Sequence, residues 1–551
     1  MKMKLIITLI ATIIYSTSES FQQISLNVQN DPKLLYVQGT AVKPKVKLFR
    51  GVKVYQYLSI PYAEPPIGTN RFQRSFPRST DVNHLIANKW GPFCAQGQLT
   101  GSKGNLIYSE DCLVLNIFTT HSRGDFQGLT LDRVRPVIVF IHGGGFNYGS
   151  ANQPDNYDGT ALAVIHDVVI VTINYRLGVF GFLHLPEHDI HGNMGLWDQR
   201  TALIWIRDNI LRFGGDPRKV TIYGHDAGAA SVAAHIISPY SRNLFVNAII
   251  QSGSIYDLDS WKVSNVSKIF LNKIGCSKVT NVINCLSKYQ HGQYPEADKL
   301  LFAPVYGDDF LPIKPEIALT SGQFNENVNV LVGVSSDPGN ILSISGSEVN
   351  PIWPTNSTFV KGQSFVGGHK YFNGLLHDLR PDNYYGINHR LISIVNVYCP
   401  TYLLAFHLAS TGRAKVYTFY QSQKLWKSMI DDKIQWSPFG QNDDFSPVFG
   451  QPLIQPNDYS KEDLILSSIM MNIWTSFAKE GLPENLGTRD WSDWSLSRSR
   501  FATNELNSMR MKKFNFQNLF EFCSDNYPSL PESHQLFGLD FGPLINSHDE
   551  L

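Results

Sequence analysis

The segment from Lys219 to Ala230 constrains the fold of this 551-residue chain more than any other. A short β-branched run, Lys219 to Tyr223, leads directly into Gly224-His225-Asp226-Ala227-Gly228, and small residues follow. A strand, a Gly-x-x-x-Gly turn and a helix start hold the central side chain out at the end of a sheet. The glycines relieve crowding where the chain turns sharply. We therefore predict a strand–turn–helix elbow with Asp226 at its tip.

Other short apolar runs predict a sheet around this elbow. They have the length and β-branched content of buried parallel strands. These runs are Pro136 to Ile141, Val168 to Tyr175, Ala248 to Gln251, Val328 to Val334 and Lys415 to Tyr420. Between two of them, Gly195 to Phe213 carries apolar residues at helical spacing. The alternation predicts an α/β fold, with a central, mostly parallel, twisted sheet flanked by helices.

Composition excludes several classes of protein. Hydrophobic residues make up 43% of the chain, which is enough for a large core and excludes a disordered or fibrous chain. The 47 basic and 47 acidic side chains cancel, and no long basic run is present. We therefore expect no nucleic-acid partner. Length alone favours three or four domains at roughly 150 residues each, and the motifs below test that expectation.

The two ends of the sequence predict a secretory protein. Lys2 and Lys4 precede a short apolar run, and the pattern predicts a signal peptide over residues 1–18, cleaved after Ser18 or Ser20. The tail over residues 544–551 ends in His-Asp-Glu-Leu, a retention signal of the endoplasmic reticulum lumen. Secretion is the alternative location. No other apolar stretch reaches spanning length, so we expect no membrane anchor.

In an oxidising compartment the six cysteines are expected to form disulfides. They are Cys94, Cys112, Cys276, Cys285, Cys399 and Cys523. All six should pair, and the sequence alone leaves 15 connectivities open. Two sequons, at Asn265 and Asn356, are candidate N-glycosylation sites.

A glycine-rich loop precedes the elbow in the sequence. His142-Gly143-Gly144-Gly145-Phe146 follows the predicted strand that ends at Ile141. The backbone N–H groups of Gly144 and Gly145, with that of Ala227, are candidate donors to an oxyanion. Either motif alone is weak, but the two in this order are much stronger.

These motifs and several others resemble the type-B carboxylesterase and cholinesterase family over nearly the whole mature length. The further matching stretches are Ser59 to Phe72, Glu110 to Asn116, Asn174 to Phe182, Gly192 to Asp198, Phe213 to Pro217 and Met470 to Gly481. The resemblance implies an α/β-hydrolase fold with large insertions, in a single domain over residues 21–543. It also implies the disulfides Cys94–Cys112, Cys276–Cys285 and Cys399–Cys523.

The catalytic positions of the family depart from its pattern here. An active member needs a serine nucleophile, a histidine base and an acid that orients the histidine. Aligned on the motifs, these positions hold Asp226, Gln441 and Pro338, although a slip of one residue would nominate Asp337 as the acid. Glutamine cannot exchange a proton near neutral pH. We therefore expect no ordinary serine-esterase catalysis.

Asp226 has two interpretations. Its carboxylate could be a nucleophile, because Gly-His-Asp-x-Gly also resembles the elbow of epoxide hydrolases and haloalkane dehalogenases. Those enzymes need a histidine that is absent from position 441, and none of His369, His377, His389 or His407 can be placed in the site from sequence. Alternatively, the carboxylate fills the former oxyanion hole and accepts hydrogen bonds from Gly144, Gly145 and Ala227.

The leading hypothesis is a non-catalytic member of the family, similar to its adhesion and binding relatives. It predicts an unknown protein partner or a small hydrophobic ligand, and no cofactor or metal. The alternative is a hydrolase of carboxylic esters or epoxides. The first cysteine pair encloses no tryptophan, only Tyr108, so a quaternary ammonium substrate is not supported. Relatives often dimerise through C-terminal helices, and Asp463 to Lys479 predicts such a helix, although its apolar residues fit the domain's own core better.

Overall fold

The structure of the chain is a computed structural model. It describes residues 22–23, 36–44, 46, 49, 51–78, 84–96, 106–121, 134–256, 260–335, 397–423, 425, 445–485, 491–494, 502–508, 512–515 and 523. The predicted signal peptide, the C-terminal tetrapeptide and positions 337, 338, 356 and 441 lie outside these residues.

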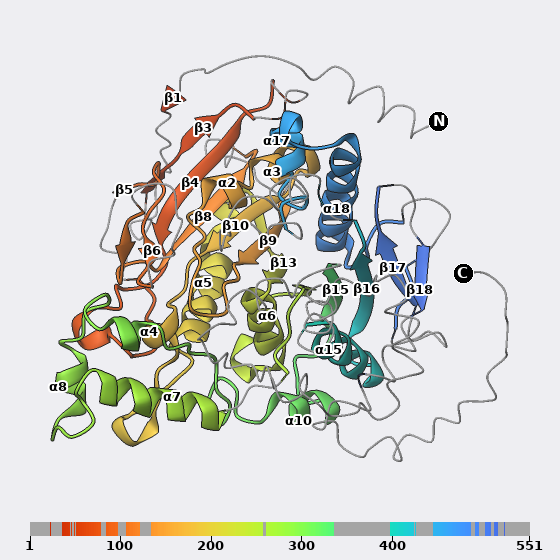
Figure 1. Cartoon of the computed structure of the whole chain (residues 1–551). Coiled ribbons are helices and arrows are strands. Elements are labelled where there is room, and N and C mark those ends of the chain that lie inside the picture. Colours follow the sequence, from red (N-terminus) through yellow and green to blue (C-terminus); the bar gives the residue numbers. More distant parts are fainter. Residues whose placement is uncertain are drawn as a thin grey trace, which may run out of the picture.

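A mixed sheet runs through the described part of the chain (Figure 1). In spatial order its twelve strands are β1 (Gln22–Gln23), β3 (Thr40–Val42), β4 (Val54–Pro61), β8 (Val114–Thr119), β10 (Val169–Ile173), β9 (Arg135–Ile141), β13 (Gly215–His225), β14 (Asn247–Gln251), β15 (Asn329–Ser335), β16 (Lys415–Gln421), β17 (Ala502–Leu506) and β18 (Lys512–Asn515). Neighbours from β10 to β17 are parallel, and the pairs toward both edges are antiparallel. The predicted parallel centre is confirmed.

Short strands and helices complete the fold. Three small pairs are β2 (Tyr36–Gln38) with β5 (His84–Ile86), β6 (Phe93–Cys94) with β7 (Tyr108–Ser109), and β11 (His184–Leu185) with β12 (Ile190–His191). The helices are α2 (Pro154–Tyr157), α3 (Thr160–His166), α4 (Gly178–Phe182), α5 (Met194–Asn209), α6 (Ala227–Ile237), α7 (Ser260–Lys273), α8 (Val282–Leu286), α9 (Pro295–Asp298), α10 (Pro315–Thr320), α15 (Cys399–Ser410), α17 (Gln451–Ile454) and α18 (Lys461–Glu480).

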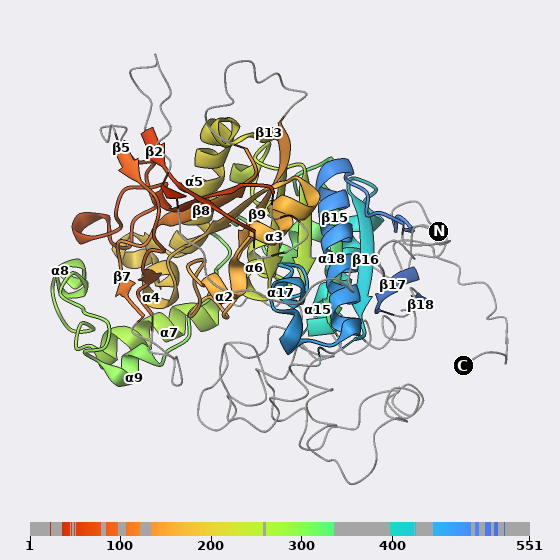
Figure 2. The ribbon, with the colours of Figure 1, turned by 90° about the horizontal axis from the view of Figure 1, so that it is seen from above.

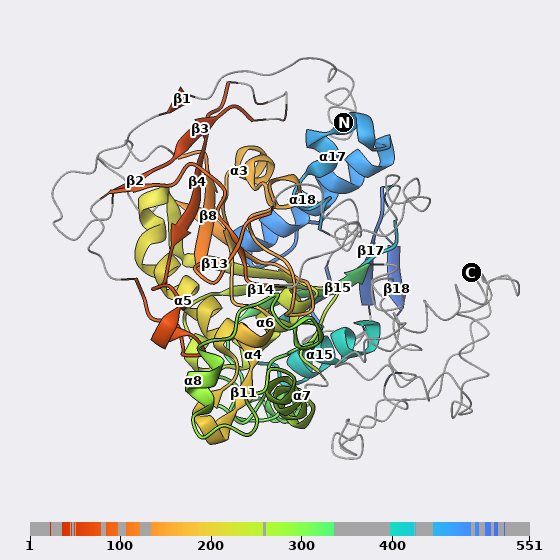
Figure 3. The same cartoon turned by 60° about the vertical axis from the view of Figure 1, so that its left-hand side comes forward.

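The sheet separates two apolar cores, because successive side chains of a strand point to opposite faces. In β9, Val137, Val139 and Ile141 join the core beneath α5, α6 and α15, whereas Ile138 and Phe140 join the core beneath α3 and α18. Figure 3 shows these helices on the two sides of the sheet. The fully apolar strands are therefore buried on both faces, as the sequence pattern predicts.

Helix α18 packs within this domain. Figure 2 shows it beside β16, where the Trp474 ring lies edge-on to Phe419 at 4.9 Å between ring centroids. Leu464, Leu466 and Phe477 are buried. The expectation that the apolar residues of this helix face the domain's own core is confirmed for these side chains. Among the described residues, no helix is both long enough and apolar enough to cross a bilayer.

All three disulfides implied by the resemblance are present. Cys94 bonds to Cys112, Cys276 to Cys285 and Cys399 to Cys523. The third joins the start of α15 to Cys523, 124 residues farther along the chain.

Candidate functional site

The elbow between β13 and α6 has the sharp geometry that the sequence predicts. Asp226 adopts φ 55° and ψ −121°, a left-handed conformation that costs a non-glycine residue about 1–3 kcal/mol. The flanking glycines are needed for close approach. A Cβ on Gly224 would lie 2.0 Å from the Gly228 carbonyl oxygen, and one on Gly228 would lie 2.0 Å from that of Ile141. The strained turn therefore fits tightly against β9.

The glycine-rich loop after β9 faces the Asp226 side chain. Gly144 and Gly145 have φ values of 113° and 58°, so their N–H groups converge on one point. These two N–H groups donate to Asp226 Oδ2 at 2.7 and 3.0 Å. The carboxylate thus occupies the position of an oxyanion between the two donors. We call residues 144–149 the oxyanion loop.

The third expected donor, the backbone N–H of Ala227, makes no hydrogen bond to the Asp226 carboxylate. Asp226 is the N-cap of α6, yet its side chain makes no capping hydrogen bond, and Ala227 does not donate to it. An N-cap side chain reaches its own helix from an extended backbone. Asp226 has a left-handed φ instead, and its carboxylate accepts from the oxyanion loop.

No cation balances the carboxylate among the described residues. The phenols of Tyr157 and Tyr175 are both buried and both feel the Asp226 charge. Burial, with the Asp226 charge as a second cause, raises the pKa of both phenols, so they stay neutral. The backbone dipoles of the loop are therefore what stabilises the negative charge.

Three described histidines, His142, His225 and His407, are poorly suited to act as a base for Asp226. Burial lowers the pKa of His142 to about 4, its Nδ1 lies 2.8 Å from the Gly143 carbonyl oxygen, and its ring stacks on Tyr175. The His225 ring packs edge-on against Phe445. His407 pairs with the Tyr256 hydroxyl. None of the three makes a hydrogen bond to Asp226.

The remaining predicted site residues are separate from the elbow. Asn265 is exposed on α7, and Asn356 lies outside the described residues together with Pro338 and Gln441. Tyr108 packs edge-on against Phe93 in the first disulfide loop.

Sequence reasoning missed two side-chain amides, Gln96 and Asn147, which hold the oxyanion loop from both sides. Two positions are the only sequence signal for them. Gln96 lies two residues after Cys94, and Asn147 comes directly after the glycine-rich stretch His142 to Phe146.

The parallel sheet, the elbow and the oxyanion loop together define a protein of the α/β-hydrolase class. Comparisons with known proteins make the class specific. The model of the carboxylesterase family matches residues 35–523. The chain belongs to the carboxylesterase family.

Its relatives include several enzymes named as acetylcholinesterases. The chain is 31% identical to acetylcholinesterase-1 of Trittame loki, over 86% of this chain and 91% of that protein. It is 33% identical to the acetylcholinesterase of Bungarus fasciatus, over 82% and 79%. It is 32% identical to acetylcholinesterase 4 of Caenorhabditis briggsae, over 81% of each.

Proposed function

We propose that this chain is a non-catalytic carboxylesterase-like protein whose oxyanion hole is filled by its own Asp226 carboxylate. One observation carries the proposal: the two N–H groups that would stabilise a reaction intermediate already donate to Asp226 Oδ2. A substrate carbonyl would have to displace a charged acceptor from these donors. Charge-assisted hydrogen bonds are about twice as strong as neutral ones, so the displacement is unfavourable.

The residues at the other two catalytic positions support the same proposal. Gln441 cannot act as a general base, and Pro338 has no side chain that could orient one. Losing one member of a serine triad already costs several powers of ten in rate. The departures at positions 226 and 441, with a third at Pro338 unless Asp337 is the acid position, therefore favour a binding role over ordinary esterase activity.

The binding role is proposed for the secretory route. Three formed disulfides fit an oxidising lumen, and the C-terminal tetrapeptide fits retention in the endoplasmic reticulum, with secretion as the alternative. The proposed occupant is a partner protein, a second copy of the chain included, or a small hydrophobic ligand. A choline ester is disfavoured because Tyr108 packs against Phe93 and no tryptophan lies in that loop.

The second candidate is a hydrolase with Asp226 as nucleophile, acting on esters or epoxides. Its specific support is the position of Asp226 at the tip of a nucleophile elbow. Against it, Oδ2 accepts from two donors, and His142 and His407 have other partners.

Hydrolysis assays separate the two candidates. Purified mature protein is offered an activated ester and an epoxide, with Asp226→Ala as the matched control. We expect equal, background rates from both proteins. Turnover that Asp226→Ala abolishes would overturn the non-catalytic proposal.

A rebuilt triad tests whether only the side chains were lost. The variant carries Asp226→Ser, Gln441→His and Pro338→Glu, and Asp226→Ser alone is its control. We expect ester turnover from the triple variant only, because the two N–H donors are then free to bind an oxyanion.

A further inference from the structure

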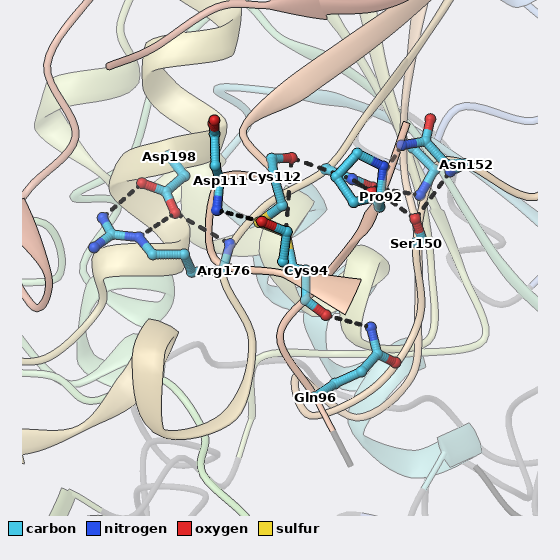
Figure 4. The surroundings of a disulfide bond; sticks show 12 residues. Pro92, Cys94, Gln96, Asp111, Cys112, Ser150, Asn152, Arg176 and Asp198 are labelled. Atoms are coloured by element: carbon cyan, nitrogen blue, oxygen red, sulfur yellow. Dashed lines mark hydrogen bonds and ion pairs between the residues drawn. A yellow bond between two sulfur atoms is a disulfide. The ribbon is translucent and has the colours of Figure 1, made fainter. Parts of the chain in front are cut away.

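The oxyanion loop is held by side chains that do not depend on its occupant. On one side Gln96 pairs with both backbone groups of Gly149: Nε2 donates to the carbonyl oxygen at 2.8 Å, and the Gly149 N–H donates to Oε1 at 2.9 Å. Gln96 Nε2 also donates to the carbonyl oxygen of Cys94 at 2.9 Å (Figure 4). The amide therefore ties the end of the oxyanion loop to the first disulfide.

Asn147 holds the other side of the loop in the same way. Its Nδ2 donates to the Phe302 carbonyl oxygen at 2.9 Å, and the Phe302 N–H donates to Oδ1 at 2.8 Å. The same Nδ2 donates to the carbonyl oxygen of Gly145, one of the two residues whose N–H groups meet Asp226. Gln96 and Asn147 are only 5% and 7% exposed, so water competes little for these bonds.

We propose that Gln96 and Asn147 are positioning residues, which keep the oxyanion loop in its anion-binding conformation, so that the loop binds small carboxylate anions once the Asp226 side chain is removed. The proposal rests on the proposed function, in which the Asp226 carboxylate fills the hole. Its physical basis is preorganisation: Gly144 and Gly145 converge because both flanks of the loop are fixed, and Asp226 is one occupant of a site that exists without it.

Acetate is the probe, because it carries the chemistry of the missing side chain. The full mature chain with Asp226→Gly is titrated with sodium acetate against sodium chloride at equal ionic strength, and the thermal midpoint gives the Kd. We expect acetate to stabilise Asp226→Gly. Wild type and Asp226→Asn should not respond, because their own side chains occupy the donors. If acetate does not stabilise Asp226→Gly, the inference is wrong, whereas the non-catalytic proposal still stands or falls with ester turnover.

Second-site variants test the positioning role. In the Asp226→Gly background, Gln96→Ala or Asn147→Ala should raise the acetate Kd about tenfold, the equivalent of one net hydrogen bond. Asn325→Ala is the matched control: Asn325 is a buried asparagine that donates to the carbonyl oxygens of His235 and Ser238, away from the loop. It should lower the thermal midpoint and leave the acetate Kd unchanged.

Conservative variants keep the test decisive if the alanine variants do not fold. Gln96→Glu retains the acceptor for the Gly149 N–H but loses both donations. It should also weaken acetate binding in the Asp226→Gly background. An unchanged Kd in Gln96→Glu and Asn147→Ala would mean that these amides only stabilise the fold, and would overturn the inference.

Discussion

Asp198 in α5 and Asp226 at the elbow are two carboxylates that the same fold treats differently. Asp198 is fully buried and accepts from Arg176 Nε at 2.8 Å, Nη2 at 2.7 Å and the Arg176 backbone N–H at 3.1 Å (Figure 4). Asp226 is half-buried and accepts from two backbone N–H groups, and it forms no ion pair with a cation in the described part of the chain.

The difference distinguishes a carboxylate that stabilises the fold, Asp198, from one that is positioned at a candidate site, Asp226. A buried ion pair tolerates no loss of one partner, because the other is left as an uncompensated charge. Asp226 has no such charged partner among the residues that the structure describes, and its backbone is strained. Strain of this kind persists at functional sites, where the side chain is held for position and not for stability. Asp226 should therefore be replaceable in the fold, and Asp198 should not.

The largest expected effect is the loss of Asp198. Asp198→Ala leaves Arg176 buried without its carboxylate, and we expect the free energy of unfolding to fall by about 3–5 kcal/mol. Urea denaturation measures it. The double variant with Arg176→Ala should lose less than the sum of the two single variants, because no unpaired charge remains. A loss below about 1 kcal/mol in Asp198→Ala would break the comparison.

Much of this fold can be predicted from the sequence, because the strands and the tight turns are encoded by short local patterns. The central strands contain short apolar runs, and Gly144, Gly224 and Gly228 mark close approaches that only glycine permits. Asp226 could be placed against Gly144 and Gly145 because both motifs end neighbouring parallel strands. Strand β17, between β16 and the edge strand β18, has the polar sequence ATNEL, carries no such pattern and was not predicted.

The hydrogen bonds by which Gln96 and Asn147 hold the oxyanion loop could not be predicted, because they depend on packing between segments that are distant in sequence. Gln96 meets Gly149 across 53 residues, and Asn147 meets Phe302 across 155. Glutamine and asparagine are common surface residues, so their type gives no warning of burial. The same holds for the absent Ala227 contact, since motif geometry does not reveal which way a capping side chain turns.

The next effect is a loss of stability at low pH. Buried histidines cause such a loss as well as carboxylates, so the two contributions must be separated. Burial lowers the pKa of His142 to about 4 and that of His235 to about 3, whereas an unfolded histidine titrates near 6.5. The unfolded chain therefore binds more protons below pH 6.5. Stability is complete above that pH and falls as the pH drops toward 4, by about 2 kcal/mol per buried histidine between pH 7 and 5.

His235→Gln isolates one histidine's share of this loss. Urea denaturation at pH 7 and pH 5 should give a smaller difference in the variant than in wild type, by about 2 kcal/mol. Both ring nitrogens of His235 lie in a buried network with Ser241 and Gln199, and neither bonds to Asp198 or Asp226. An unchanged difference would assign the acid loss to the carboxylates.

The smallest effect, at Asp226, is the most informative. Asp226→Gly loses two hydrogen bonds to a charged acceptor, but Asp226 is only half-buried, so water replaces much of that loss, and the glycine also relieves the strained φ. We expect its free energy of unfolding to stay within about 1 kcal/mol of wild type. Asp226→Ala loses the same bonds and keeps a Cβ at φ 55°, so it should be less stable than Asp226→Gly by about 1 kcal/mol. Urea denaturation of the three proteins at pH 7 gives both differences. If Asp226→Gly instead loses as much stability as Asp198→Ala, Asp226 is a structural anchor like Asp198. The elbow would then be maintained by its carboxylate, and the filled hole would serve folding and not a binding site.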